Sequence, residues 1–163
     1  MARSIGPGLR HHWQRLSCWP GGKWLFSRVL GLTVPYTGKL GSRVQTLVPG
    51  YCVVILCDRR KVRNHLRSIH AMALANLGEM VTGLALLNSL PDRTRGILTG
   101  FSISYLKKAR GTLTAECRCE IPNSGDTCEL TLTGIIHDTA GDTVATAEAR
   151  WLIGPEKEQS GAH

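Results

Sequence analysis

The feature that most constrains the fold is a long apolar segment, residues 71–90, whose length and composition predict a helix. It is rich in Ala and Leu on nearly all of its faces and Pro91 follows it, so the helix should be buried. Four strand-like runs come after it, at residues 97–106, 112–120, 127–137 and 143–153. An antiparallel sheet wrapped around a buried helix hides both apolar surfaces, and this predicts an α+β fold.

The segment before that helix is predicted to hold a shorter helix and two strands. Apolar residues recur at helical spacing over residues 23–34, where Pro35 ends the pattern. Strands are expected at residues 43–48 and 51–58, followed by a basic loop. The chain is therefore divided into a basic N-terminal arm, one domain and a polar C-terminal tail, at residues 1–22, 23–153 and 154–163. The Gly and Pro residues of the arm suggest that it is poorly ordered or loosely docked.

Alternation along the first strand after the long helix predicts which side chains share a face. Residues at every second position should point the same way. The predicted face consists of Ile97, Thr99, Phe101, Ile103 and Tyr105. Leu98 is then expected on the opposite face from Thr99.

The positive charge is concentrated in the first half of the chain. The net charge is +8, and residues 1–70 hold twelve Lys or Arg but one acidic residue, Asp58. Such an asymmetry indicates an anionic partner, which could be nucleic acid, an acidic membrane surface or a phosphorylated ligand. A solvated basic face is the alternative. Nucleic acid is not expected, because no aromatic-rich recognition strand accompanies the charge.

Polar residues interrupt the apolar surroundings between residues 64 and 80, where the sequence reads NHLRSIHAMALANLGEM. Unpaired polar groups in an apolar setting cost about 1–3 kcal/mol each. Asn64, His65, His70 and Glu79 therefore either satisfy one another or perform chemistry. The first N–H groups of the predicted helix, beginning with Ala71, also point toward its positive end and could stabilise an oxyanion.

The spacing N-x5-H-x8-E of these residues resembles the active-site run of phenylacetate-type acyl-CoA thioesterases, which have the hotdog fold. The run GILTGFSISYLKKARG, residues 96–111, is similar to the strand after the central helix of that family. The forms N-H-x-x-S-I-H-A and N-L-G-E-M look closest to a bacterial branch of hotdog proteins of unassigned function, related to the C-terminal domain of a proposed acetyltransferase. The resemblance covers about residues 23–153.

The resemblance implies a hotdog homodimer or homotetramer that hydrolyses an acyl thioester. Glu79 would be the base or nucleophile, contributed across a dimer interface, with Ala71 N–H as oxyanion donor. His70 would orient the loop or the carbonyl, and Asn64 would position water. Two departures favour a non-catalytic acyl-CoA binding protein instead: Ala71 stands where the thioesterases usually have Gly, and Leu98 where some relatives carry Ser.

A second spacing keeps another activity open. His65 and Glu79 are fourteen residues apart, similar to the His–Glu pair of hotdog hydroxyacyl-thioester dehydratases. The Pro-Gly that usually opens the central helix of that family is replaced by Met72-Ala73. We therefore rank a dehydratase below a thioesterase.

Basic residues on both sides of the motif suit the phosphates of coenzyme A, as part of the substrate, or an acidic acyl carrier protein. They are Arg59, Arg60, Arg63, Arg67, Lys107, Lys108 and Arg110. No separate cofactor is expected. No metal is expected either, because the histidines lack Cys or acidic partners at ligand spacing.

The remaining features indicate a cytoplasmic protein. The sequence has no apolar run of 18 residues, no secretory signal and no C-x-x-C pair among its six cysteines. Trp13, Trp19 and Trp24 in the basic N-terminal region leave membrane-surface contact as a less favoured alternative.

Overall fold

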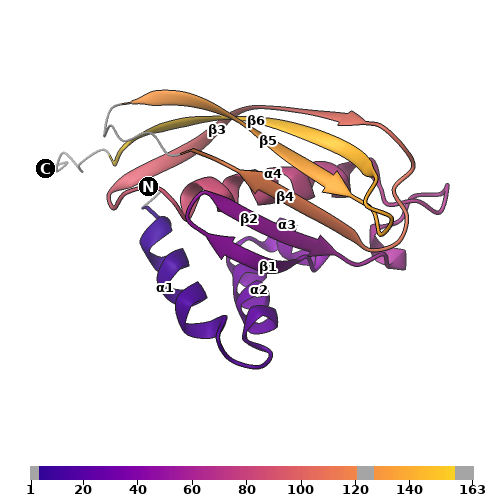
Figure 1. Cartoon of the computed structure of the whole chain (residues 1–163), viewed down its shortest axis with the longest axis horizontal. Coiled ribbons are helices and arrows are strands. Elements are labelled where there is room, and N and C mark those ends of the chain that lie inside the picture. Colours follow the sequence, from indigo (N-terminus) through magenta and orange to yellow (C-terminus); the bar gives the residue numbers. More distant parts are fainter. Residues whose placement is uncertain (1–3, 121–126, 157–163) are drawn as a thin grey trace, which may run out of the picture.

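The structure is a computed structural model that describes residues 4–120 and 127–156. Its elements, in chain order, are α1 (Gly6–Leu16), α2 (Gly22–Thr33), α3 (Pro35–Leu40), β1 (Arg43–Val48), β2 (Tyr51–Leu56), the short 3-10 helix η1 (Arg60–Val62), α4 (Ala71–Leu87), β3 (Thr94–Tyr105), β4 (Leu113–Arg118), β5 (Cys128–His137) and β6 (Thr143–Pro155). The strands form one antiparallel sheet in the order β1-β2-β4-β5-β6-β3, which curves over α4 (Figure 1). The predicted α+β fold is confirmed.

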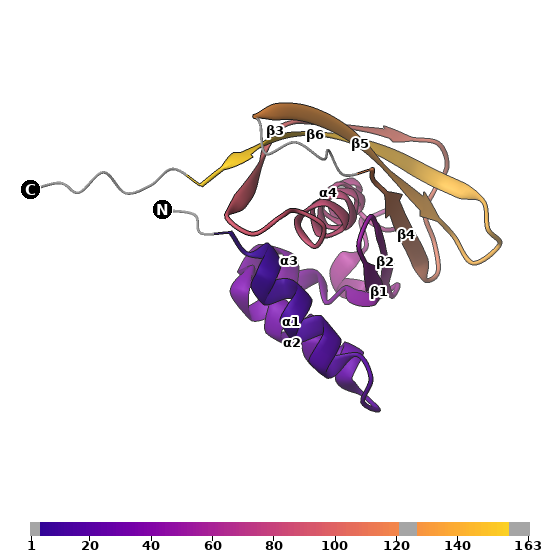
Figure 2. The same cartoon turned by 60° about the vertical axis from the view of Figure 1, so that its left-hand side comes forward.

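The core lies between α4 and the concave face of the sheet (Figure 2). Helix and sheet approach closely because small residues face each other: a Cβ on Gly78 would lie 2.5 Å from Cβ of Ala147 on β6. Alanine usually stabilises a helix relative to glycine by about 0.5–1 kcal/mol. At Gly78, however, the added methyl group would force the backbone of α4 or β6 to move. Trp151 covers Gly83 one turn further along. The close approach fixes α4, and with it Glu79, relative to β3 and β6.

Strand β3 corrects the predicted face. The pairing of β3 with β6 shifts register between Leu98 and Gly100, so an extra residue interrupts the alternation. Leu98, Phe101 and Ile103 consequently pack against the core, whereas Ile97 and Thr99 are exposed. Leu98 and Thr99 point in opposite directions as expected, but the prediction that Ile97 and Thr99 share a face with Phe101 was wrong.

The N-terminal segment is not a loosely docked arm, which corrects the prediction for residues 1–22 over its described part. Helix α1 packs on α2, with Trp13 only 8% exposed and its ring edge-on to Phe26 at 5.0 Å between centroids. Arg10 donates to the carbonyls of Asn88 and Leu90, at 3.1 and 2.8 Å, and so ties α1 to the end of α4. The division of the chain into arm, domain and tail stays a prediction.

Helices α2 and α3 form a tight hairpin on the side of α4 away from the sheet (Figure 2). The predicted helix at 23–34 is confirmed as α2, but α3 was not expected. The two helices touch through their backbones, because a Cβ on Gly38 would lie 2.1 Å from the carbonyl oxygen of Gly31. The Asn76 amide on α4 donates to Thr37 Oγ1 at 3.0 Å and holds the hairpin in place.

Candidate functional site

The N-terminal end of α4 has one free amide. His70 caps the helix: its Nδ1 accepts from Met72 N–H at 3.1 Å, and its carbonyl accepts from Ala73 N–H at 2.9 Å. Ala71 N–H donates to no acceptor within the described part of the chain. It lies at the positive end of the helix dipole. The Ala71 N–H, which was predicted to be an oxyanion donor, therefore makes no hydrogen bond within the described residues.

Asn64 organises the loop that leads into this helix end. Its Oδ1 accepts from Leu66 N–H at 2.9 Å and from both the N–H and the hydroxyl of Ser68 at 3.2 Å. Ile69 N–H is in turn bound to the carbonyl of Ala109 at 2.9 Å, which joins the loop to the segment after β3. The Asn64 oxygen is thus committed to the turn, and only its amide group is left to contact a ligand.

Two substitutions separate these two uses of Asn64. Asn64→Ala removes the acceptor of the turn and should lower the free energy of unfolding by about 1–3 kcal/mol. Asn64→Asp keeps the acceptor and should leave the melting temperature nearly unchanged, while removing the amide donor. Thermal unfolding and thiol-release rates would be compared for both variants. Full activity in the Asp variant would show that Asn64 acts on the turn alone.

A cavity of about 240 Å³ opens beside this loop. It is lined by Asn64, Ser68, Ile69, Ala71, Leu74, Tyr105, Leu106, Lys107, Lys108 and Ala109. Four of the predicted site residues thus come together here, two of them basic. This volume is smaller than that of usual ligand pockets, about 300–1,000 Å³.

Tyr105 was not predicted as a site residue, although it also lines this cavity. Its hydroxyl donates to the carbonyl of Ala71 at 3.1 Å, which joins the end of β3 to the first residue of α4. Burial raises the pKa of the Tyr105 phenol, so it stays a hydrogen-bond donor. No motif in the sequence signals this contact between elements 34 residues apart.

Glu79 is a half-buried carboxylate on α4 that holds no hydrogen bond or ion pair within residues 4–120 and 127–156. The other half-buried carboxylates there all have partners; they are Asp58, Glu116, Asp138 and Glu156. Burial raises the pKa of Glu79, because the charged form loses hydration without gaining a donor. An uncompensated buried carboxylate is typical of a general base or nucleophile.

Ala71 and Glu79 cannot serve the same substrate within one copy of the chain. They are eight residues apart on a straight helix, which separates them by about 12 Å along its axis. Attack on a carbonyl held at Ala71 N–H requires approach to about 3–3.5 Å. A site that used both groups would therefore take Glu79 from a second copy.

The two histidines take different positions. His70 is exposed and, with Nδ1 accepting from Met72 N–H, keeps its proton on Nε2. His65 is exposed in the turn that Asn64 organises, and no hydrogen bond joins it to Glu79 among the residues described. In one copy, the structure does not bring together the pair expected of a dehydratase.

The predicted phosphate-binding residues do not form one cluster. Arg63 is paired with Asp58 at 2.6 Å, and Lys107 with Asp138 and Asp142 at 2.8 and 2.6 Å. Arg59 donates to backbone carbonyls at the end of α3, away from the small cavity. The others are exposed without an ion pair in the described ranges, namely Arg60, Arg67, Lys108 and Arg110.

No group of three or more His, Cys, Asp and Glu that could hold a metal ion occurs within the part of the chain that the structure describes. The six cysteines are all free. Burial raises the pKa of the Cys52 thiol, and raises that of Cys117, opposite it on β4, to about 12, so neither is a ready nucleophile.

Comparison with known families shows which family the chain belongs to. Residues 22–153 match the family model described as a domain of unknown function, DUF4442. The chain belongs to the DUF4442 family. No curated protein shows significant sequence similarity to it.

Solved structures share the architecture over nearly their whole length. A structural-genomics protein designated APC5556 superposes with a TM-score of 0.79 at 27% identity, over 91% of this chain and 99% of that one. A protein of unknown function from Pseudomonas aeruginosa, PA5026, described as a probable thioesterase, gives 0.74 at 21% identity, over 85% and 97%. A thioesterase family protein from Silicibacter pomeroyi gives 0.65 at 18% identity, over 79% and 96%. The predicted hotdog fold is confirmed for this DUF4442 protein.

Proposed function

We propose that this DUF4442 protein hydrolyses acyl thioesters, carried by coenzyme A or by acyl carrier protein, in a site shared by two copies of the chain. The observation that carries the proposal is Glu79, a half-buried carboxylate without a partner among the described residues, on the same helix as the free Ala71 amide. The thioesterase descriptions of several structural neighbours agree with it.

The edge strand β3 is the proposed contact between the two copies. It is 12 residues long, pairs on one side with β6 and leaves its other side open, with Ile97 and Tyr105 partly exposed. An open edge of this length readily pairs with another strand. Two-fold pairing of β3 with its copy would set the two α4 helices antiparallel, so that Ala71 of one copy approaches the middle of the other helix.

The chemistry follows from the two groups. The Ala71 amide of one copy would bind the thioester oxygen and stabilise its negative charge in the transition state. Glu79 of the other copy would take a proton from the water that attacks the carbonyl, or would attack the carbonyl itself to give an anhydride that water then cleaves. In either route the C–S bond breaks and the carrier leaves as its thiol. The raised pKa of Glu79 makes it a stronger base than an exposed carboxylate. Lys108 at the small cavity would neutralise phosphate of the carrier. The free thiols, of which those of Cys52 and Cys117 are buried, agree with a reducing compartment such as the cytoplasm.

The proposal is tested by thiol release from a panel of acyl-CoA and acyl-carrier thioesters. We expect turnover with at least one member, and we expect the active species to be dimeric or larger by light scattering. Saturable binding of the same acyl-CoAs without turnover would establish the alternative, a non-catalytic acyl-CoA binding protein. Ala71 and Leu98, which depart from the thioesterase pattern, favour that alternative.

A further inference from the structure

Exposed apolar side chains are concentrated on α2 and in the segments beside it, outside the small cavity at the start of α4. Fifteen large apolar side chains are exposed in the described chain, and seven of them fall between residues 19 and 36. These seven define the α2–α3 face: Trp19, Trp24, Leu25, Val29, Leu32, Val34 and Tyr36. Trp19, Leu32 and Tyr36 are 72%, 76% and 68% exposed. Contiguous exposed apolar patches mark interaction surfaces.

The exposed apolar side chains of α2 lie on one side of the helix. Trp24, Arg28 and Leu32 follow at four-residue intervals, so they lie in one row along the helix, with Leu25 and Val29 beside it. Phe26 points to the opposite side and is buried against Trp13. Helix α2 therefore carries apolar residues both on its packed side and on its open side.

The charged residues on and beside this apolar face are basic. Residues 1–57 contain seven Lys or Arg and no Asp or Glu. On and beside the α2–α3 face, Arg28, Lys39 and Arg43 are exposed and form no ion pair among the residues described. A two-fold contact through this face would bring its cations close to the cations of the second copy, which is repulsive. The complementary partner is apolar and anionic.

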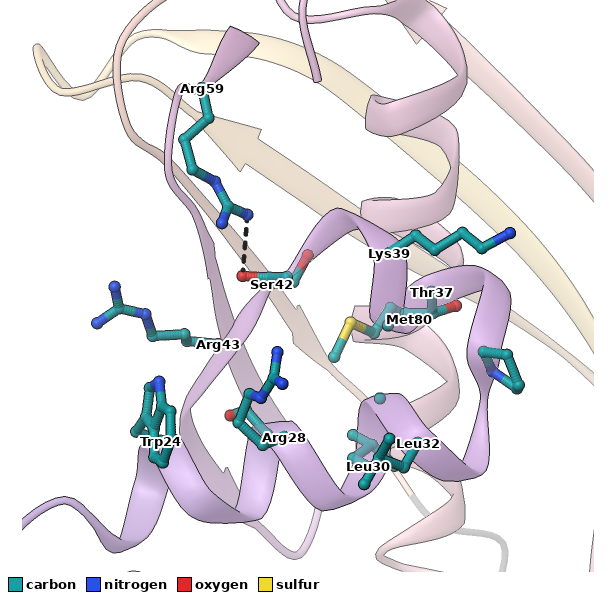
Figure 3. A pocket seen from close by; sticks show the side chains of 15 residues that line it. Trp24, Arg28, Leu30, Leu32, Thr37, Lys39, Ser42, Arg43, Arg59 and Met80 are labelled. Atoms are coloured by element: carbon teal, nitrogen blue, oxygen red, sulfur yellow. Dashed lines mark hydrogen bonds between the residues drawn. The ribbon is translucent and has the colours of Figure 1, made fainter. Parts of the chain in front are cut away.

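A cavity of about 440 Å³ opens within the same face, between α2, α3 and β1 (Figure 3). Apolar side chains form part of its wall, including Trp24, Leu30, Leu32 and Met80. Four cationic residues complete it, namely Arg28, Lys39, Arg43 and Arg59. Such a lining suits a molecule with an anionic head and an apolar tail.

A buried hydroxyl inside this cavity lacks a partner. Ser42 is 7% exposed, and its Oγ has no hydrogen bond within the described residues. In Figure 3, Arg59 lies on one side of Ser42 and Arg28 on the other. Arg59 is held there by the backbone carbonyls of Leu40 and Gly41. A hydroxyl without a partner and two guanidinium groups that line the same cavity are suitable donors to a phosphate.

We propose that the α2–α3 face docks on an anionic phospholipid membrane, and that the cavity receives one lipid phosphate between Arg28, Ser42 and Arg59. Trp19, Trp24 and Leu32 would enter the interface, while Arg28, Lys39 and Arg43 contact anionic headgroups. The contact is interfacial, because none of the helices in the described ranges is long and apolar enough to cross a bilayer. Of the tryptophans first suspected of membrane contact, Trp13 is excluded by its burial against Phe26.

Co-sedimentation of the full chain with vesicles tests this proposal. Phosphatidylcholine vesicles with or without phosphatidylglycerol would be compared at low and high salt. We expect binding to the anionic vesicles, with weakening at high salt, and about fivefold weaker partitioning for each of Arg28→Ala and Arg43→Ala. Arg150→Ala, an exposed cation on the sheet, is the matched control and should bind normally.

The apolar contribution is tested by Leu32→Glu, with Val48→Glu as the control at another exposed apolar position. Leu32→Glu should lower binding more than tenfold and Val48→Glu should not. Equal binding by both variants, or no binding by the wild type, would overturn the proposal. So would a change of oligomeric state without vesicles in Leu32→Glu alone, since a second copy would then cover the face. Vesicle binding needs no thioester, so Glu79→Gln should bind like the wild type whatever the outcome for hydrolysis.

Discussion

Replacing Glu79 with Gln should lower thiol release by a factor of about 10²–10⁴, which is the range for loss of a general base. Gln has nearly the same shape as Glu but can neither take a proton nor attack a carbonyl. Glu148→Gln is the matched control, because Glu148 is exposed on β6 and should tolerate the change. Rates for both variants would be measured with the best substrate from the acyl-CoA panel.

The same substitution should stabilise the protein at neutral pH. Burial raises the pKa of Glu79 in the folded state, so its ionisation opposes folding. Below the pKa of Glu79 in the unfolded chain, about 4.3, Glu79 is protonated in both states and its contribution to the free energy of unfolding is complete. This contribution is lost as the pH rises through the higher pKa of Glu79 in the folded protein. Glu79→Gln should therefore melt above the wild type at neutral pH, with the gain disappearing in acid. A variant that lost activity and also melted lower would indicate a structural role instead.

Replacing Ala71 with Pro should reduce turnover by about 10²–10³-fold while leaving the fold intact. Proline removes the N–H that would bind the oxyanion, and loss of one such donor has an effect of this size in other hydrolases. Proline is favoured at the first position of a helix. His70 before it has φ −64° and ψ 140°, the extended conformation that a following proline requires.

Ala71→Ser is the control for this position, since it keeps the N–H. Activity and melting temperature would be measured together for both variants. We expect Ala71→Pro to melt at or slightly above the wild-type temperature, because proline restricts the unfolded chain. Normal turnover in a folded Ala71→Pro variant would remove this amide from the mechanism.

The sequence predicted the helix and the strands whose apolar residues recur at regular intervals. The buried helix and the alternating strands were found because their apolar spacing records which side faces the core. Helix α3 was missed because Pro35 was interpreted only as the end of α2, although proline also favours the first turn of a new helix. Helix α1 was missed because its glycines and Pro7 suggested irregular structure, yet Leu9, Trp13 and Leu16 already follow helical spacing.

The candidate site was predictable only in part, because its residues meet through contacts that spacing does not encode. Alternation places side chains on a face only while the ladder is regular, and it does not record the bulge at Thr99, for which Gly100 was a local signal. The bond from Tyr105 to Ala71 depends on where β3 ends relative to α4. Sequence spacing gave Asn64 and Glu79 as candidates, but not that the oxygen of Asn64 is committed to a turn.

The contact between Gly78 and Ala147 also limits where a substrate can lie. Helix and strand touch there without an intervening side chain, so an aliphatic chain cannot thread between α4 and β6. Under the proposed function, the acyl group would lie elsewhere along α4, toward β3 and the second copy. The interface between the two protomers would then select for short or long acyl groups. Substitutions at that interface, rather than in the interior, would change the preferred chain length.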